Sequence, residues 1–151
     1  MEAVAAVSSI AGIISLAGQA LSGIVKLRGF FNEYASASKS IDRFLRNLNS
    51  LLQTLEDVKE IAVKLENVEG FNAKSVLASL EIQLEDCARD VYDWVKVGSE
   101  HHPQSVKGSK AVFKRFLVAA NKDSLTDIFR DIACHKDNII LKLSVIGRSG
   151  S

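Results

Sequence analysis

The chain has 151 residues, the length of one domain and enough to bury a hydrophobic core without disulfides. Its net charge is +1, so no strong overall field attracts nucleic acid. One proline, few aromatic residues and abundant aliphatic residues indicate an all-α fold. Cys87 and Cys134 lie far apart and outside any metal-ligand spacing, which favours buried, reduced thiols in an intracellular protein.

The first element is an uncharged segment, 3–25, that ends at Lys26. As a helix it is about 35 Å long, enough to cross the roughly 30 Å hydrocarbon core of a bilayer. A secretory signal peptide needs a positive leading region, whereas the only charged side chain before the apolar run is Glu2. A permanent membrane anchor fits by length, but Ala, Ser and Gly supply little transfer energy. The third interpretation is a buried helix of a soluble bundle.

A second helix is predicted from Ile41 to Glu66, where apolar residues recur at intervals of three and four. These positions are Ile41, Phe44, Leu45, Leu48, Leu51, Leu52, Leu55, Val58, Ile61, Ala62 and Leu65. Gly70 interrupts the pattern, and Asn72 is a suitable N-cap for a third helix that we expect to end near Val97. The buried seam expected for this third helix is Leu77, Leu80, Leu84, Cys87, Val91 and either Trp94 or Val95.

The only proline, Pro103, interrupts the chain in the loop 98–105. A fourth helix is predicted over 106–120, and a fifth begins after a cap at Asp123 or Ser124 and reaches about Val145. The apolar positions of these two helices are Val112, Phe113, Phe116, Leu117, Leu125, Ile128, Phe129, Ile132, Ala133, Ile139, Ile140 and Leu143.

Short connections between helices favour antiparallel neighbours. We therefore expect an up-and-down helical bundle of four to five helices over residues 1–146, which includes an apolar N-terminal helix over 1–27. Residues 147–151 are expected to form a flexible tail or to be the scar of a truncation.

The sequence offers little for catalysis, and we expect no enzyme, no metal and no cofactor. His101 and His102 are adjacent in a loop that contains proline, where they are expected to be solvated. Cys134 and His135 are also neighbours, which predicts a core cysteine beside a surface histidine. The acid pairs Glu85/Asp86 and Asp90/Asp93 fit the solvated face of the third helix. The phosphate-binding, dinucleotide-binding, zinc-protease and hydrolase motifs do not occur.

A basic run without an intervening acid lies between Val106 and Lys122. It contains Lys107, Lys110, Lys114, Arg115 and Lys122. Each such residue contributes on the order of 1 kcal/mol at an anionic membrane surface, so the run is a candidate site for anionic lipid. The alternative is a solvated face that the acidic second and third helices balance. Nucleic acid is not expected, because no aromatic platform accompanies the charge.

The order of these features resembles a known family. An uncharged first helix rich in small residues begins at the first Met, and a long Leu-rich helix follows. The C-terminal sequence FKRFLVAANKDSLTDIFRDIACHKDNIILKLSVIG then pairs a basic helix with Leu-x-x-Ile-Phe and His-Lys-x-x-Ile-x-Leu-x-Leu. Over residues 2–145 the chain is similar to the HeLo-like (HELL) N-terminal domain of fungal STAND (NACHT-containing) immune receptors and related cell-death effectors.

The resemblance implies a helical bundle similar in shape to the four-helix bundle of the necroptosis executioner. It also implies that amyloid or NLR-type receptor signalling causes oligomerisation and that the N-terminal helix then enters the plasma membrane. In this chain the matching inserting element is 3–25, and 124–145 is expected to be scaffold. The sequence shows no NACHT region and no amyloid motif, so we expect the sensor half to be absent from this chain.

These observations lead to the hypothesis of a pore- or lesion-forming execution domain for programmed cell death. It would be cytoplasmic at rest and at the plasma membrane when activated, as a homo-oligomer on anionic lipid. The residues expected to insert are Val4, Val7, Ile10, Ile13, Ile14, Leu16, Leu21 and Ile24. The small face expected to pack against other helices consists of Ser8, Gly12, Ser15, Gly18 and Ser22.

Two alternatives stay open. The first is a non-lytic adaptor domain of a STAND receptor, which would make homotypic protein contacts without permeabilising membranes. The second is a permanently anchored helical protein, which the weak hydrophobicity of 3–25 disfavours.

Overall fold

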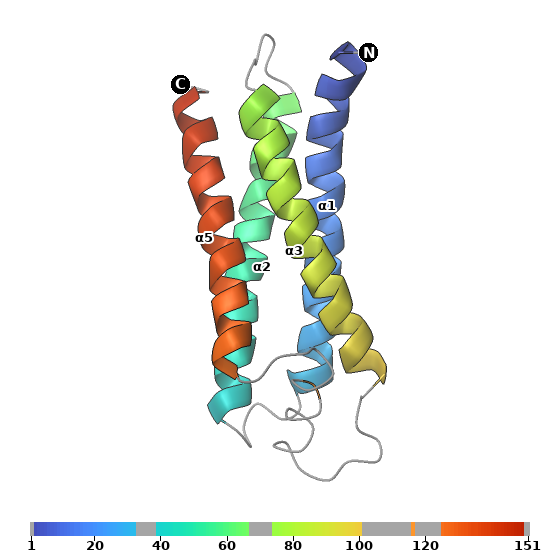
Figure 1. Ribbon diagram of the computed structural model, residues 1–151, viewed down its shortest axis with the longest axis vertical. Coiled ribbons are helices and arrows are strands. Elements are labelled where there is room, and N and C mark those ends of the chain that lie inside the picture. Colours follow the sequence, from blue (N-terminus) through green and yellow to red (C-terminus); the bar gives the residue numbers. More distant parts are fainter. Residues whose placement is uncertain (1, 33–38, 67–73, 101–115, 117–124, 150–151) are drawn as a thin grey trace.

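The computed structural model describes residues 2–32, 39–66, 74–100, 116 and 125–149. Within these ranges the chain forms four helices and no strand: α1 (Glu2–Phe31), α2 (Lys39–Glu66), α3 (Lys74–Glu100) and α5 (Leu125–Ser149). α1 and α3 run in one direction, and α2 and α5 run in the other (Figure 1). The predicted all-α helical bundle is therefore confirmed. The predicted fourth helix, 106–120, lies outside the described residues apart from Phe116.

The four described helices form a ring in which each helix packs against two others. α1 packs against α2 and α3, and α5 also packs against α2 and α3. α1 and α5 therefore lie diagonally opposite each other in the bundle (Figure 1). Each helix keeps the rest of its surface away from its two neighbours.

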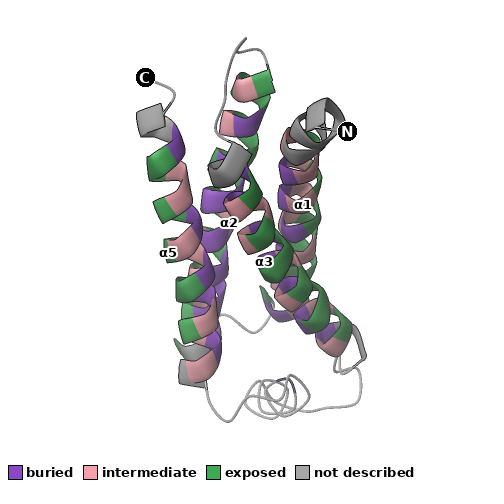
Figure 2. Cartoon of the chain, turned by 45° about the horizontal axis from the view of Figure 1, so that its top comes forward, coloured by how far each residue is buried: buried purple, intermediate pink, exposed green. Residues whose placement is uncertain are grey.

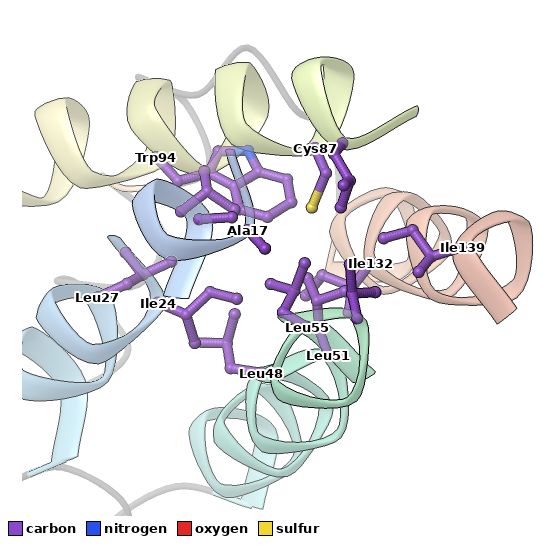
Figure 3. Packing of buried hydrophobic residues seen from close by; sticks show 14 of the residues in the cluster. Ala17, Ile24, Leu27, Leu48, Leu51, Leu55, Cys87, Trp94, Ile132 and Ile139 are labelled. Atoms are coloured by element: carbon purple, nitrogen blue, oxygen red, sulfur yellow. The ribbon is translucent and has the colours of Figure 1, made fainter. Parts of the chain in front are cut away.

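The core follows the predicted seams of α2 and α3. The buried residues of these helices are Ile41, Phe44, Leu45, Leu48, Leu51, Leu55, Val58, Ala62, Leu77, Leu80, Leu84, Cys87, Val91 and Trp94. Trp94, and not the half-buried Val95, completes the seam of α3. Leu51 and Leu55 of α2 face Ile132 and Cys87 across the core (Figure 3). Spacings of three and four keep these side chains on one face, and Figure 2 shows buried positions alternating with exposed ones along each helix.

Three phenylalanines close one end of the core. The ring centroids of Phe31 and Phe44 lie 5.6 Å apart, and those of Phe31 and Phe116 lie 5.2 Å apart, both with the rings edge to face. The Phe44 and Phe116 centroids are 5.9 Å apart. Edge-to-face geometry is favourable because the positive edge of one ring meets the negative face of another. The cluster joins the end of α1 to the start of α2 and confirms the predicted burial of Phe116.

α1 and α5 extend beyond their predicted ends, and α3 also continues past Val97 to Glu100. α1 continues through Lys26 and Arg28 to Phe31, because Leu27 and Phe31 prolong its buried face while Lys26 stays exposed. α5 continues past Val145 through Ser149, and Ile146 is buried near that end. Residues 147–149, expected to belong to a tail, are therefore helical.

The buried face of α5 differs in part from the predicted one. Ile128, Ile132 and Ile139 are buried, whereas Ala133 is exposed and Ile140 is 42% exposed. The predicted burial of Ala133 and Ile140 was wrong, because the prediction considered only apolar residues as candidates for the buried face. The actual seam passes through His135 and ends at Ile146, which keeps the same spacing of three and four.

The phenylalanine cluster yields a stability prediction. Phe44→Ala should lower the free energy of unfolding by about 3–5 kcal/mol, because it removes a fully buried ring and leaves a cavity. Urea denaturation followed by circular dichroism measures this change. Tyr92→Ala is the matched control, because that side chain is exposed and its loss should change stability by at most about 0.5 kcal/mol. Equal effects of the two substitutions would contradict the assigned core.

Candidate functional site

The candidate site is α1 itself. The 22-residue stretch Ile10–Phe31 is the one helix in the described part of the chain that is long and apolar enough to cross a membrane. Core helices of soluble proteins also reach such length and apolarity, but most of their residues are buried. The buried fraction of α1 therefore helps to distinguish the two cases. Only 28% of the most apolar window is buried in the bundle. The other residues of the window are half-buried or exposed, because α2 and α3 cover one face of α1.

The residues that α1 buries in the core overlap only in part with those expected to insert into the membrane. Its buried positions are Ile13, Ala17, Ala20, Ile24, Leu27 and Phe31. They alternate by four and three residues, a pattern readable in the sequence once the helix is extended past Lys26. Of the residues expected to insert, Ile13 and Ile24 belong to this buried face. Four others are half-buried: Ile10, Ile14, Leu16 and Leu21.

Val4, Val7 and Ser8 lie on α1, but their side chains are outside the described set. The structure therefore divides the predicted apolar residues between the core and its margin. Val25, which the prediction did not include among the inserting residues, is 56% exposed on the same helix.

The small face of α1 is open to solvent over much of its length. Ser15 and Ser22 are exposed, and Gly12 and Gly18 are half-buried. Part of this face forms one wall of a groove of about 540 Å³ between α1 and α3. The groove is lined by Ser15, Gly18, Gln19, Ser22, Gly23, Lys26, Ala88, Tyr92 and Val95. Within it, Gln19 Nε2 donates a hydrogen bond to Ser15 Oγ at 3.2 Å. Ser15 and Ser22 of the small face are thus left uncovered in the bundle.

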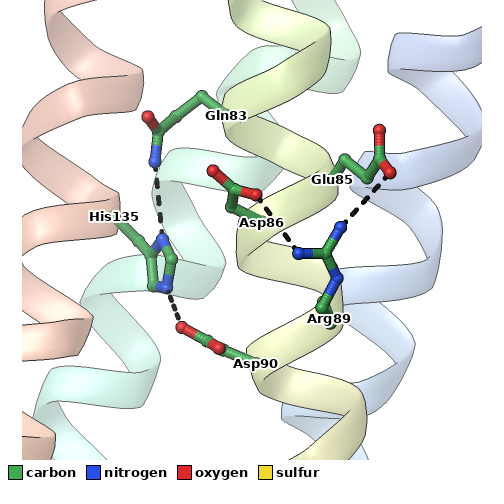
Figure 4. A network of polar contacts seen from close by, with 6 residues as sticks. All are labelled: Gln83, Glu85, Asp86, Arg89, Asp90 and His135. Atoms are coloured by element: carbon green, nitrogen blue, oxygen red, sulfur yellow. Dashed lines mark hydrogen bonds and ion pairs between the residues drawn. The ribbon is translucent and has the colours of Figure 1, made fainter.

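A polar contact fastens α5 to α3 (Figure 4). His135 Nε2 lies 2.6 Å from Asp90 Oδ2, and Gln83 Nε2 lies 3.5 Å from His135 Nδ1. His135 is only 8% exposed. A buried imidazole costs free energy unless its nitrogens are hydrogen-bonded, and both nitrogens have partners here. The contact therefore stabilises the side of the bundle opposite α1.

This contact corrects two predictions. His135 is buried and Cys134 is exposed, which reverses the predicted core cysteine and surface histidine. Asp90 was assigned to a solvated face, but it is partly buried and bonds His135. The chain gave no signal for this pairing, because the two residues are far apart in sequence. By contrast, Glu85 and Asp86 are solvated as predicted, each in an ion pair with Arg89 at 3.4 and 3.7 Å.

The described residues provide little reactive chemistry. Burial, with a smaller effect from the Asp90 carboxylate, raises the pKa of the Cys87 thiol from 9.0 to about 12. The thiolate is the nucleophilic form, so Cys87 is inert at neutral pH. No group of three or more His, Cys, Asp or Glu side chains in this part of the chain could hold a metal ion.

Several expectations are not tested. The basic residues Lys107, Lys110, Lys114, Arg115 and Lys122 lie outside the described residues. Comparisons with known protein families, with characterised proteins and with solved structures find no match to this chain. The lipid contact and the HeLo-like resemblance therefore stay predictions.

The two cysteines should differ sharply in reactivity. In the native protein near pH 8, a thiol reagent should modify Cys134 quickly and leave Cys87 unmodified, because Cys87 is buried and protonated. Mass spectrometry after timed labelling measures this difference. The Cys134→Ser variant should show no native labelling and one modification in urea. Native labelling of Cys87 at its denatured rate would contradict the packing of α3.

The His135 contact should contribute measurably to stability. Asp90→Ala removes the partner of a buried ring nitrogen, so we expect a loss of about 1–3 kcal/mol in the free energy of unfolding. Asp93→Ala on the same helix is the control, since Asp93 is exposed and its loss should matter by at most about 0.5 kcal/mol. Chemical denaturation compares the two. An Asp90→Ala variant as stable as Asp93→Ala would refute a stabilising role.

Proposed function

We propose that this chain is a HeLo-like, membrane-targeting execution domain for programmed cell death in fungal immunity. In the resting cytoplasmic state α1 packs on α2 and α3. On activation by an upstream NLR or amyloid partner, α1 leaves the bundle and enters the plasma membrane. Several copies insert together and form a pore or lesion, and anionic lipid is the membrane partner.

The observation that carries this proposal is the incomplete burial of an apolar helix. A span of 22 residues matches the hydrocarbon thickness, yet only 28% of its most apolar window is buried in the bundle. Transfer of such a helix to lipid removes the remaining apolar surface from water at roughly 25 cal/mol per Å². The core contacts of Ile13, Ile24 and Leu27 oppose this transfer. Two states of similar free energy are what a switch requires.

Oligomerisation follows from the composition of α1. Gly, Ser and Gln residues weaken insertion of a single helix, because they offset the transfer free energy of Ile and Leu. The same small residues allow two helices to approach closely in a membrane. Ser15, Gly18 and Ser22 already lie on an uncovered face, so they are available for such contacts once α1 is in lipid.

The alternative is a non-lytic adaptor of a STAND receptor that makes homotypic contacts. A specific observation favours it: α5 exposes Ile140, Leu141 and Val145, which lie close together on one helix. An exposed apolar cluster of this kind is typical of a protein interaction surface. This function predicts association of copies without damage to membranes.

A charge in the middle of α1 should separate these functions. Gly18→Glu places a carboxylate where a new Cβ has no neighbour within 4 Å, so the bundle should still fold. A charge at the centre of a membrane span costs on the order of 3 kcal/mol, which corresponds to a loss of leakage activity of about a hundredfold. Dye leakage from anionic liposomes measures the effect, and circular dichroism checks the fold.

Ile82→Glu is the matched control, because it also adds one negative charge at an exposed position, but on α3. It should leak dye like the unaltered chain. Equal leakage by Gly18→Glu and Ile82→Glu would exclude insertion of α1. Oligomerisation of the unaltered chain on liposomes without any leakage would favour the adaptor.

A further inference from the structure

The contact between α1 and α3 contains two glycine notches, positions at which a glycine of one helix leaves room for a side chain of the other. A Cβ added at Gly23 of α1 would lie 2.5 Å from Val91 Cγ1 of α3. A Cβ added at Gly98 of α3 would lie 2.8 Å from Cδ2 of Phe30 on α1. Each helix thus receives a side chain of the other at a position where only glycine leaves room. The two contacts, Gly23–Val91 and Phe30–Gly98, are seven residues apart along each helix. Together they fix the register of the parallel helices α1 and α3.

Other glycines of α1 lack this constraint. At Gly18 and Gly29 an added Cβ would have no neighbour within 4 Å. At Gly12 the added Cβ would approach Glu81 Oε1, the end of a flexible side chain that can rotate aside. Val91 cannot yield so easily, because it is only 1% exposed and its branched side chain has few rotamers. Among the described glycines of α1, Gly23 is therefore the one most sensitive to added volume.

We propose that these reciprocal notches are the lock that holds α1 on α3, and that loosening them releases α1. The proposal rests on the function proposed above and specifies how the resting state is held. In a packed core, one extra methyl group forces the backbones apart. At Gly23 this displacement separates α1 from α3 and leaves the contact of α5 with α2 and α3 in place, because α5 lies on the other side.

Hydrogen exchange measured on the full chain tests the lock. In Gly23→Ala, amides of α1 should exchange at least about tenfold faster than in the unaltered chain, the size expected for core overpacking by one methyl group. Amides of α5 should keep their rates. Gly18→Ala is the matched control: it makes the same substitution on the same helix in open space, so α1 should exchange no faster. Unchanged α1 rates in Gly23→Ala, or equal acceleration in all helices, would overturn the proposal.

A double-mutant cycle that combines Gly23→Ala with Val91→Ala tests whether the effect of Gly23→Ala comes from its contact with Val91. With Val91→Ala, the offending Cγ1 is gone, and an alanine Cβ at 23 would lie 3.8 Å from the Cβ at 91, an ordinary contact distance. Adding Gly23→Ala to Val91→Ala should therefore not accelerate exchange of α1 further. Full additivity of the two substitutions would show that Gly23→Ala acts elsewhere.

Liposome leakage then connects the lock to activity. Gly23→Ala should leak dye at a protein concentration about tenfold lower than Gly18→Ala does. Faster α1 exchange without greater leakage, in a protein that does leak, would overturn the role of the lock in activation. If no variant leaks at all, the proposed function fails, and hydrogen exchange alone still decides whether the notches hold α1.

Discussion

The arrangement of the bundle depends on how α1 packs against α3. These two helices run in parallel and interlock at Gly23 and Gly98, so their backbones approach closely in one register. α2 then covers a second side of α1. α5 lies diagonally opposite α1 and is held there by its own core residues and by the His135–Asp90 contact. The apolar helix α1 is in this way held in the bundle by α2 and α3, although these helices do not surround it.

Close packing through glycine has consequences for the stability of α1. Small side chains contribute little buried apolar area, so close packing at the glycines adds to the hydrophobic contacts that hold α1. Ile13, Ile24, Leu27 and Phe31 supply the large apolar contacts, whereas Ser15 and Ser22 stay at the surface. A helix held in this way needs only a small displacement to lose many contacts together. This property suits a switch better than it suits a permanent scaffold.

Much of the bundle was predictable, because the seams of α2 and α3 consist of apolar residues at regular spacing, which simple periodicity detects. The prediction failed where a polar residue occupies a core position. His135 belongs to the seam of α5, and only its pairing with Asp90 of another helix makes its burial favourable. The buried face of α1 was hard to assign because apolar residues surround the helix. The role of Gly23 depends on Val91 of α3 and so required three-dimensional information.

The central claim, that α1 moves from the bundle into lipid while the other helices stay outside, can be measured with a fluorophore sensitive to its environment. The label is attached at Leu21→Cys on α1, a half-buried residue expected to insert, or at Ile82→Cys on α3, an exposed position, in a Cys134→Ser background where Cys87 is buried. With anionic vesicles, the label at position 21 should shift to the blue and be quenched by brominated acyl chains, and the label at position 82 should not. A label at position 21 that is not quenched on vesicles that leak, or equal quenching at both positions, would contradict this account.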